Sequence, residues 1–186
     1  MSRPLKKNAT YADLCEVPEN FVAEILGGDL YAFPRPASRH SFAASVLGAE
    51  LMGPFHRGNN GPGGWWLLDE PELHFDADVL VPDIAGWRRE RMPTFPDTAY
   101  IAVAPDWVCE VLSPSTEKID RSKKLAIYAR EGVRHVWLVD PLLRTLEVLR
   151  LESQRWSLVA AHEGGASVRA EPFDAIELPL AALWPE

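Results

Sequence analysis

Three carboxylates lie where the sequence is otherwise apolar. Glu24 interrupts the run FVAEIL, Asp83 follows the run VLVP, and Glu110 lies inside the run WVCEVL. A carboxylate that is buried while ionised destabilises a protein unless it is hydrogen-bonded, paired with a cation or bound to a metal. Because all three lie in strand-like runs, we expect them to converge on one site.

Converging carboxylates repel one another, and a divalent cation relieves that repulsion. Mg²⁺ binds a few carboxylates together with waters and phosphate oxygens. We therefore hypothesise that Mg²⁺, with Mn²⁺ as the alternative ion, binds where the three carboxylates converge. Alternation along a strand places Glu110 on the same face as Val108 and Leu112. The competing interpretation is that the carboxylates are structural and accept hydrogen bonds from the backbone.

A lysine that could act with these acids lies in the helix expected over residues 116–130. Positions 121, 124, 125 and 128 form one stripe of that helix, which places Lys124 at the margin of its buried face. From there its ammonium could reach the carboxylates, orient an attacking water and stabilise the charge that develops on a phosphoryl group. Lys123 points further toward solvent. Because helix lysines usually extend outward, a solvent-facing Lys124 is the competing interpretation.

The elements that must position these residues are a mixture of strands and helices. Gly27 and Gly28 indicate a hairpin between two strand-like runs, and Ser38 is expected to cap the next helix. The expected strands are 21–26, 29–33, 65–68, 72–75, 79–84, 107–112, 135–139, 145–151 and 155–159, and the expected helices are 12–16, 38–52 and 116–130. This order predicts an α/β (α+β) fold with a central mixed sheet, flanking helices and a β-hairpin added at each end.

Composition restricts the class of protein. The 186 residues are 47% hydrophobic, which suits a single domain over 1–186 with a substantial core. Cys15 and Cys109 are the only cysteines, so a disulfide scaffold and a cysteine zinc site are excluded. Without a membrane-length apolar run or a secretory signal, a cytoplasmic protein with no membrane partner is expected. The formal charge of −8 argues against bulk-charge binding to nucleic acid, but not against a local basic groove.

The middle of the sequence resembles the signature of the Uma2 family, which belongs to the PD-(D/E)XK restriction-endonuclease-like superfamily. The resemblance extends over about residues 10–184. It is carried by VPDI at 81–84, PDWVCEVLSPST at 105–116, Asp120, Lys124–Leu125, Tyr128, Gly132–Val133 and VWLVDP at 136–141, and upstream by EILGGDL at 24–30 and Arg39–His40. It implies a restriction-endonuclease-like fold and Mg²⁺-dependent hydrolysis of phosphodiester bonds.

The resemblance also implies a role for each candidate residue. Asp83 matches the metal-binding aspartate of the Pro-Asp motif, Glu110 matches the second acidic residue, and Glu24 matches an additional acidic residue nearer the amino terminus. The superfamily's lysine normally stands two residues after the second acid, where this sequence has Leu112. Lys124 is the candidate replacement from the following helix. The implied catalytic set is therefore Glu24, Asp83, Glu110 and Lys124, with the metal on Asp83 and Glu110.

Other polar residues have interpretations that compete with a role in the site. His40 near a helix start could contact phosphate or relay a proton, although such histidines are more often capping or surface residues. Asp120 is expected to cap or enter its helix. The basic clusters within 88–91 and 118–123 would suit either a phosphate-contacting rim or a solvated surface. Trp65–Trp66 could stack on bases, or pack in the core or in a dimer interface.

The resulting functional hypothesis is a Mg²⁺-dependent endonuclease that acts on nucleic acid, with DNA favoured. A catalytically silent, nuclease-like binding or assembly module is the alternative, and the displaced lysine and the acidic charge favour it. A third interpretation is a hydrolase of small phosphodiesters, which needs no basic groove. A homodimer is expected, because two sites cut both strands most simply and because the chain is rich in edge hairpins.

Overall fold

A mixed sheet forms the centre of the protein. The computed structural model describes residues 3–185. Within them, the central sheet has six strands in the order β10 (Arg155–Glu163), β9 (Thr145–Glu152), β8 (His135–Asp140), β7 (Trp107–Val111), β6 (Ile84–Arg88) and β3 (Trp65–Asp69). β7 and β8 run parallel, and the other neighbours run antiparallel. A parallel pair needs a crossover connection, which the helix between β7 and β8 supplies.

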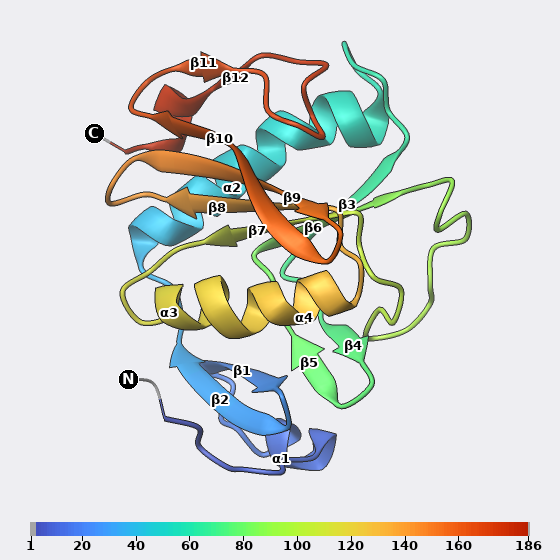
Figure 1. Cartoon of the computed structure of the whole chain (residues 1–186), viewed down its shortest axis with the longest axis vertical. Coiled ribbons are helices and arrows are strands. Elements are labelled where there is room, and N and C mark those ends of the chain that lie inside the picture. The colour runs from blue at the N-terminus through green and yellow to red at the C-terminus, as the bar shows by residue number, and fades with distance from the viewer. Residues whose placement is uncertain (1–2, 186) are drawn as a thin grey trace.

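A smaller antiparallel sheet lies near the amino terminus, at the bottom of Figure 1. Its four described strands have the order β2 (Asp29–Pro34), β1 (Phe21–Leu26), β5 (Asp78–Leu80) and β4 (Leu73–Phe75). Gly27 and Gly28 join β1 to β2 with φ angles of 64° and 78°, the positive values that a tight two-residue hairpin requires. Near the carboxyl terminus, β11 (Ser167–Val168) pairs with β12 (Leu178–Pro179).

Helices cover both faces of the central sheet. The helical segments are α1 (Tyr11–Cys15), α2 (Ser38–Leu51), the π-helical turn η1 (Met52–Arg57), α3 (Glu117–Ile119), the π-helical turn η2 (Asp120–Lys124), α4 (Leu125–Arg130) and the 3₁₀ turn η3 (Leu180–Leu183). α3, η2 and α4 follow one another without a break and are called the crossover helix. Figure 1 shows α2 and the carboxyl-terminal segment on one side of the sheet and the crossover helix on the other. Within residues 3–185, no helix is long and apolar enough to cross a membrane.

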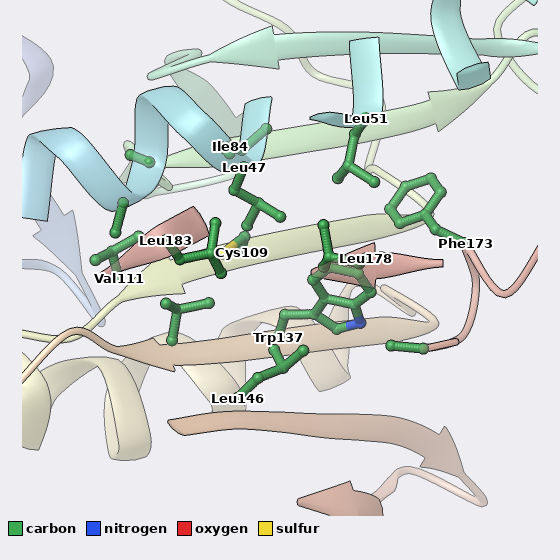
Figure 2. Close-up of a cluster of buried hydrophobic side chains, with 14 of the residues drawn as sticks. Leu47, Leu51, Ile84, Cys109, Val111, Trp137, Leu146, Phe173, Leu178 and Leu183 are labelled. Atoms are coloured by element: carbon green, nitrogen blue, oxygen red, sulfur yellow. The ribbon is translucent and has the colours of Figure 1, made fainter. Parts of the chain in front are cut away.

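The core on the α2 side is closed by the carboxyl-terminal segment. Figure 2 shows Leu47 and Leu51 of α2 near Cys109 and Trp137 of the sheet, with Phe173 at the edge of the cluster. The Phe173 ring packs against four aromatic rings at centroid distances from 4.6 to 5.6 Å, namely Phe55, Trp65, Trp107 and Trp137. Phe173 thus packs the carboxyl-terminal segment against the sheet.

The core on the opposite side joins the two sheets through the crossover helix. Ile127 and Tyr128 of the helix are buried in one cluster with Val108 and Val136 of the central sheet. The same cluster includes Leu26, Tyr31, Phe33, Leu73, Phe75 and Leu80 of the smaller sheet. Burial of these apolar side chains is the main force that keeps the smaller sheet and the helix together.

The predicted α/β (α+β) class with a central mixed sheet and flanking helices is confirmed, but two local expectations are wrong. The expected strand 79–84 is divided, because Asp78–Leu80 pairs in the smaller sheet and Ile84–Arg88 pairs in the central sheet. Pro82 lies at the break, where it has no N–H to offer a strand ladder. Ser38 does not cap α2 but is its first residue, and Ala37 precedes it without a side-chain hydrogen bond.

Replacing Phe173 by Ala is expected to lower the free energy of unfolding by about 3–5 kcal/mol, because it removes a fully buried aromatic ring. Urea unfolding followed by tryptophan fluorescence measures the loss. Leu143→Ala is the matched control, since Leu143 is 72% exposed and its truncation should change stability by less than about 0.5 kcal/mol. Equal stability of the two variants would contradict the closing role of Phe173.

Candidate active site

The four residues proposed from the sequence line one cavity. Glu24 comes from β1, Asp83 from the link between β5 and β6, Glu110 from β7 and Lys124 from the crossover helix. The cavity has a volume of about 300 Å³ and lies where the smaller sheet meets the central sheet. The structure therefore brings together residues that are up to 100 positions apart in the chain, while their catalytic roles stay predictions.

The ammonium of Lys124 lies among three carboxylates. Its Nζ atom is 2.9 Å from Glu110 Oε2, 3.0 Å from Glu24 Oε1 and 3.6 Å from Asp120 Oδ1. Lys124 is 4% exposed and Glu24 is 3% exposed. The interpretation in which Lys124 extends into solvent is therefore wrong, and the lysine instead binds the acidic residues to one another.

A π-helical turn carries Lys124 into the cavity. Over Asp120–Lys124 the helix widens, and the Leu125 N–H donates to the Asp120 carbonyl five residues earlier. Both Asp120 and Lys124 are buried in this turn. Such turns occur frequently at functional sites, which suits a turn that directs the side chains of Asp120 and Lys124 to the same point.

Glu110 is held on both of its oxygens. Oε2 accepts a hydrogen bond from Lys124 at 2.9 Å, and Oε1 accepts one from the Tyr128 hydroxyl at 2.5 Å. Tyr128 is fully buried, and its burial together with the charge of Glu110 raises the pKa of its hydroxyl well above the usual value. Tyr128 therefore remains a hydrogen-bond donor and orients the Glu110 side chain.

Asp83 is paired with a histidine of α2. Its Oδ1 atom lies 3.2 Å from His40 Nε2, and its Oδ2 atom accepts a hydrogen bond from the Val111 N–H at 2.7 Å. Burial lowers the pKa of His40, but the hydrogen bond and charge of Asp83 outweigh that effect and raise it. Nδ1 of His40 is buried and has no hydrogen-bond partner within the described chain.

The break between β5 and β6 is stabilised by the site itself. The Val81 N–H donates to Glu24 Oε1 at 2.8 Å, and the Val81 carbonyl accepts from Lys124 Nζ at 3.4 Å. Buried backbone groups that leave a strand ladder need such partners. The side chains of the site thus replace the sheet hydrogen bonds that are lost where the chain passes from one sheet to the other.

The cavity carries more acidic groups than basic ones. Burial raises the pKa of Glu24, Glu110 and Asp120, although Lys124 opposes the rise in each case. For Lys124 burial lowers the pKa, but the charges of Glu110 and Glu24 outweigh burial and raise it well above the usual value. Lys124 is therefore an ammonium at neutral pH, and the carboxyl groups around it outnumber the single lysine.

The donor atoms of the cavity are compatible with a hard divalent ion. Asp83 and Glu110 offer carboxylate oxygens beside a water-sized space, and each oxygen can accept more than one interaction. Within residues 3–185, however, no group of three His, Cys, Asp or Glu side chains is arranged to hold a metal. The two carboxylates would therefore bind an ion together with water or phosphate oxygens, as is usual for Mg²⁺.

Three residues of the site lie outside the catalytic set proposed from the sequence. His40 is buried and contacts Asp83, so it is neither a capping nor a surface residue. Asp120 and Tyr128 stand four residues before and after Lys124, and all three lie on one buried face of the crossover helix. That spacing could have indicated from the sequence that Asp120 and Tyr128 lie beside Lys124, because residues four apart on a helix face the same direction.

Three arginines of the two basic clusters are engaged by other residues of the fold. Arg89 donates to the carbonyls of Trp65 and His56, and Arg91 forms an ion pair with Asp106. In the other cluster, Arg121 pairs with Glu117 and Glu147. Neither cluster contributes a residue to the walls of the cavity in the described chain. These arginines have structural roles.

The paired tryptophans also have a structural role. Trp65 is buried in the core on the α2 side, and Trp66 donates its indole N–H to the Met92 carbonyl. The guanidinium groups of Arg88 and Arg89 lie over the rings of Trp65 and Trp66, at 4.6 and 4.0 Å from the ring centroids. Core packing, rather than base stacking, accounts for these rings.

Replacing Lys124 by Met is expected to lower the free energy of unfolding by about 3–5 kcal/mol, because Glu24 and Glu110 lose their buried cation. The loss should be largest near pH 8 and smaller near pH 5. Both glutamates have a raised pKa, so a falling pH protonates them and removes the unpaired charge.

Urea unfolding at both pH values measures this effect. Lys123→Met is the matched control, since the Lys123 ammonium lies 5.4 Å from the ring centroid of Tyr31 and such a contact contributes about 0.5–1 kcal/mol. A Lys124→Met variant as stable as the control would show that the buried carboxylates do not need the lysine.

Comparisons with known proteins identify the family and the fold of the chain. The model of the Uma2 family, described as "Putative restriction endonuclease", matches residues 9–181. A crystal structure of "a putative nuclease belonging to DUF820" from Anabaena variabilis ATCC 29413 has the same fold, with a TM-score of 0.74, 22% sequence identity, and coverage of 95% of this chain and 97% of that one. The search of curated proteins gave no match. Because the family model spans nearly all of the sequence, the chain belongs to the Uma2 family and has a restriction-endonuclease-like fold.

Proposed function

We propose that this protein is a nuclease that hydrolyses phosphodiester bonds in nucleic acid with the help of a divalent metal ion. The observation that carries the proposal is the buried ammonium of Lys124 held between Glu24 and Glu110 in a cavity that Asp83 also lines. Membership of a family described as restriction endonucleases favours DNA as the substrate. Mg²⁺ is the proposed ion and Mn²⁺ the alternative.

Asp83 and Glu110 are the residues proposed to hold the metal. A bound divalent ion would polarise a phosphate oxygen and make water more acidic. In the reaction, the oxygen of a water molecule bonds to phosphorus, one P–O ester bond breaks, and a proton passes to the departing oxygen. The protein's own groups must orient that water and neutralise the charge that develops on the phosphoryl oxygens.

Lys124 is suited to neutralising the charge that develops on the phosphoryl oxygens. Its raised pKa keeps it protonated, so it acts as a hydrogen-bond donor and a positive charge rather than as a base. A donor aimed at developing negative charge typically contributes about 10²–10³ in rate. Glu24 accepts from both Lys124 and the Val81 N–H, which fixes the direction of the ammonium. Glu24 is thus proposed to act by positioning Lys124.

A catalytically silent binding or assembly module is the second candidate. One observation favours it: the Glu110 oxygens are already engaged by Lys124 and Tyr128, and Asp83 is engaged by His40. In such a module the same contacts would only stabilise the fold. Homodimer formation and a cytoplasmic location stay predictions. β3 and β10 lie at the two edges of the central sheet and could pair with another chain.

The variants Asp83→Asn and Glu110→Gln are expected to lose cleavage activity by at least about 100-fold, because an amide oxygen is a poorer ligand for a hard divalent ion than a carboxylate. Cleavage of plasmid and of labelled oligonucleotides with Mg²⁺ or Mn²⁺ measures the loss. Asp97→Asn is the matched control, since Asp97 is exposed. If both site variants cut as well as the parent does, the proposed nuclease activity is wrong.

Titration calorimetry with Mn²⁺ separates the two candidates without relying on activity. The nuclease proposal expects Mn²⁺ to bind the parent and the Asp97→Asn control, and to bind Asp83→Asn at least about tenfold more weakly. Binding should also weaken as pH falls, because protons compete with the metal for the carboxylates. Parent and Asp83→Asn titrations with the same affinity would favour the silent module.

A further inference from the structure

The groups proposed to act on the phosphodiester bond lie at the bottom of the cavity. Glu110 is 2% exposed, Glu24 is 3% exposed and Lys124 is 4% exposed. The volume of about 300 Å³ is at the lower end of small-molecule sites. A phosphate group can therefore reach Lys124 only by entering the cavity, and cannot do so from a flat surface laid across its mouth.

The mouth of the cavity lies between two short segments. Residues 33–37 include the end of β2 and its link to α2 on one side, and residues 113–116 precede the crossover helix on the other. Pro34, Pro36 and Pro114 lie in these segments and restrict their backbone.

In a duplex, each phosphate is carried on a backbone whose bases are paired to a second strand, and freeing a nucleotide from the stack costs a few kcal/mol. An unpaired strand avoids that cost.

A second hollow continues the cavity along the smaller sheet. The two hollows share Val22, Arg35, Glu70 and Val81 as wall residues. The second hollow also reaches Tyr11 and Phe21, whose side chains are 43% and 38% exposed. Exposed aromatic rings beside a groove are the usual platforms on which unpaired bases stack.

The walls of the second hollow offer little positive charge. Arg35 is exposed and contributes a positive charge to both hollows. Glu70 lines both hollows and Glu72 lines the second, so base stacking rather than charge would hold a strand there. The arginines that could have held a duplex, Arg91 and Arg121, are paired with carboxylates. Nonspecific duplex binding depends on several such free cations.

We propose that the substrate is a single-stranded segment of nucleic acid. Its phosphodiester group enters the cavity beside Asp83 and Lys124, and a neighbouring base stacks on Phe21 or Tyr11 in the second hollow. The inference rests on the proposed nuclease function, because it assigns the substrate of that site. Single-stranded tails, gaps and frayed ends all offer an unpaired phosphodiester group to the cavity, whereas the interior of a paired duplex does not.

Fluorescence anisotropy with EDTA present tests binding apart from cleavage. The probes are a fluorescein-labelled 12-nucleotide DNA strand and the same strand in a blunt duplex. We expect the single strand to bind at least about tenfold more tightly. Phe21→Ala should weaken single-strand binding by about fivefold or more, the lower limit for one base–aromatic stack. Phe42→Ala is the matched control, because Phe42 is 42% exposed but does not line either hollow in the described chain.

Equal affinity for the two probes, no binding of either, or an unchanged affinity in Phe21→Ala that keeps its melting temperature would overturn the inference. Cleavage of the same probes with Mn²⁺ then separates this inference from the proposed function. If the duplex is cut as fast as the single strand, the substrate assignment is wrong and the nuclease function stands. If the single strand binds tightly but is never cut, the nuclease function is wrong and the binding preference stands.

Discussion

The structure depends on one buried ammonium surrounded by acids. Without Lys124, the carboxylates of Glu24, Glu110 and Asp120 would be confined together in an apolar interior, which is strongly unfavourable. The ammonium of Lys124 stabilises the contact of three separate elements at one point: the first hairpin, a central strand and the crossover helix. The hydrophobic clusters supply most of the energy of folding, but they are tolerant of small shifts. The charged cluster adds contacts of defined geometry between the smaller sheet, the central sheet and the crossover helix.

The connection between the two sheets also depends on the side chains of the site. Asp83 lies where the chain leaves the smaller sheet and enters the central one, and Pro82 beside it prevents a continuous ladder. The backbone at this point is hydrogen-bonded to the side chains of the site, through Glu24 and Lys124 on Val81 and through Asp83 on Val111. Residues that could serve the reaction are therefore also those that permit the fold, and substituting them conservatively is the only way to separate the two roles.

The sequence predicted the acids and the lysine because each breaks a simple pattern: Glu24 and Glu110 interrupt apolar runs, and Lys124 lies at the margin of a helical stripe. It also predicted the mixed sheet and the crossover helix. The division of the expected strand 79–84 was missed because the apolar run 79–82 is typical of one strand, although Pro82 within it was the available signal. The burial of His40 was inaccessible, since its partner Asp83 is far away in the chain. The basic clusters were ambiguous for a related reason: local charge does not disclose the distant carboxylates that pair with it.

The position of Lys124 on the crossover helix has a consequence for the stage of folding at which the site is complete. In a site contained within one hairpin or one strand, the reactive groups would be neighbours even in a partly folded chain. Here Lys124 is delivered by a turn of the crossover helix, between β7 and β8, to acids on β1 and β7. A nascent chain that has completed only its first sheet holds Glu24 without its lysine. The cluster of Glu24, Glu110 and Lys124 is therefore complete only when the crossover helix packs against both sheets.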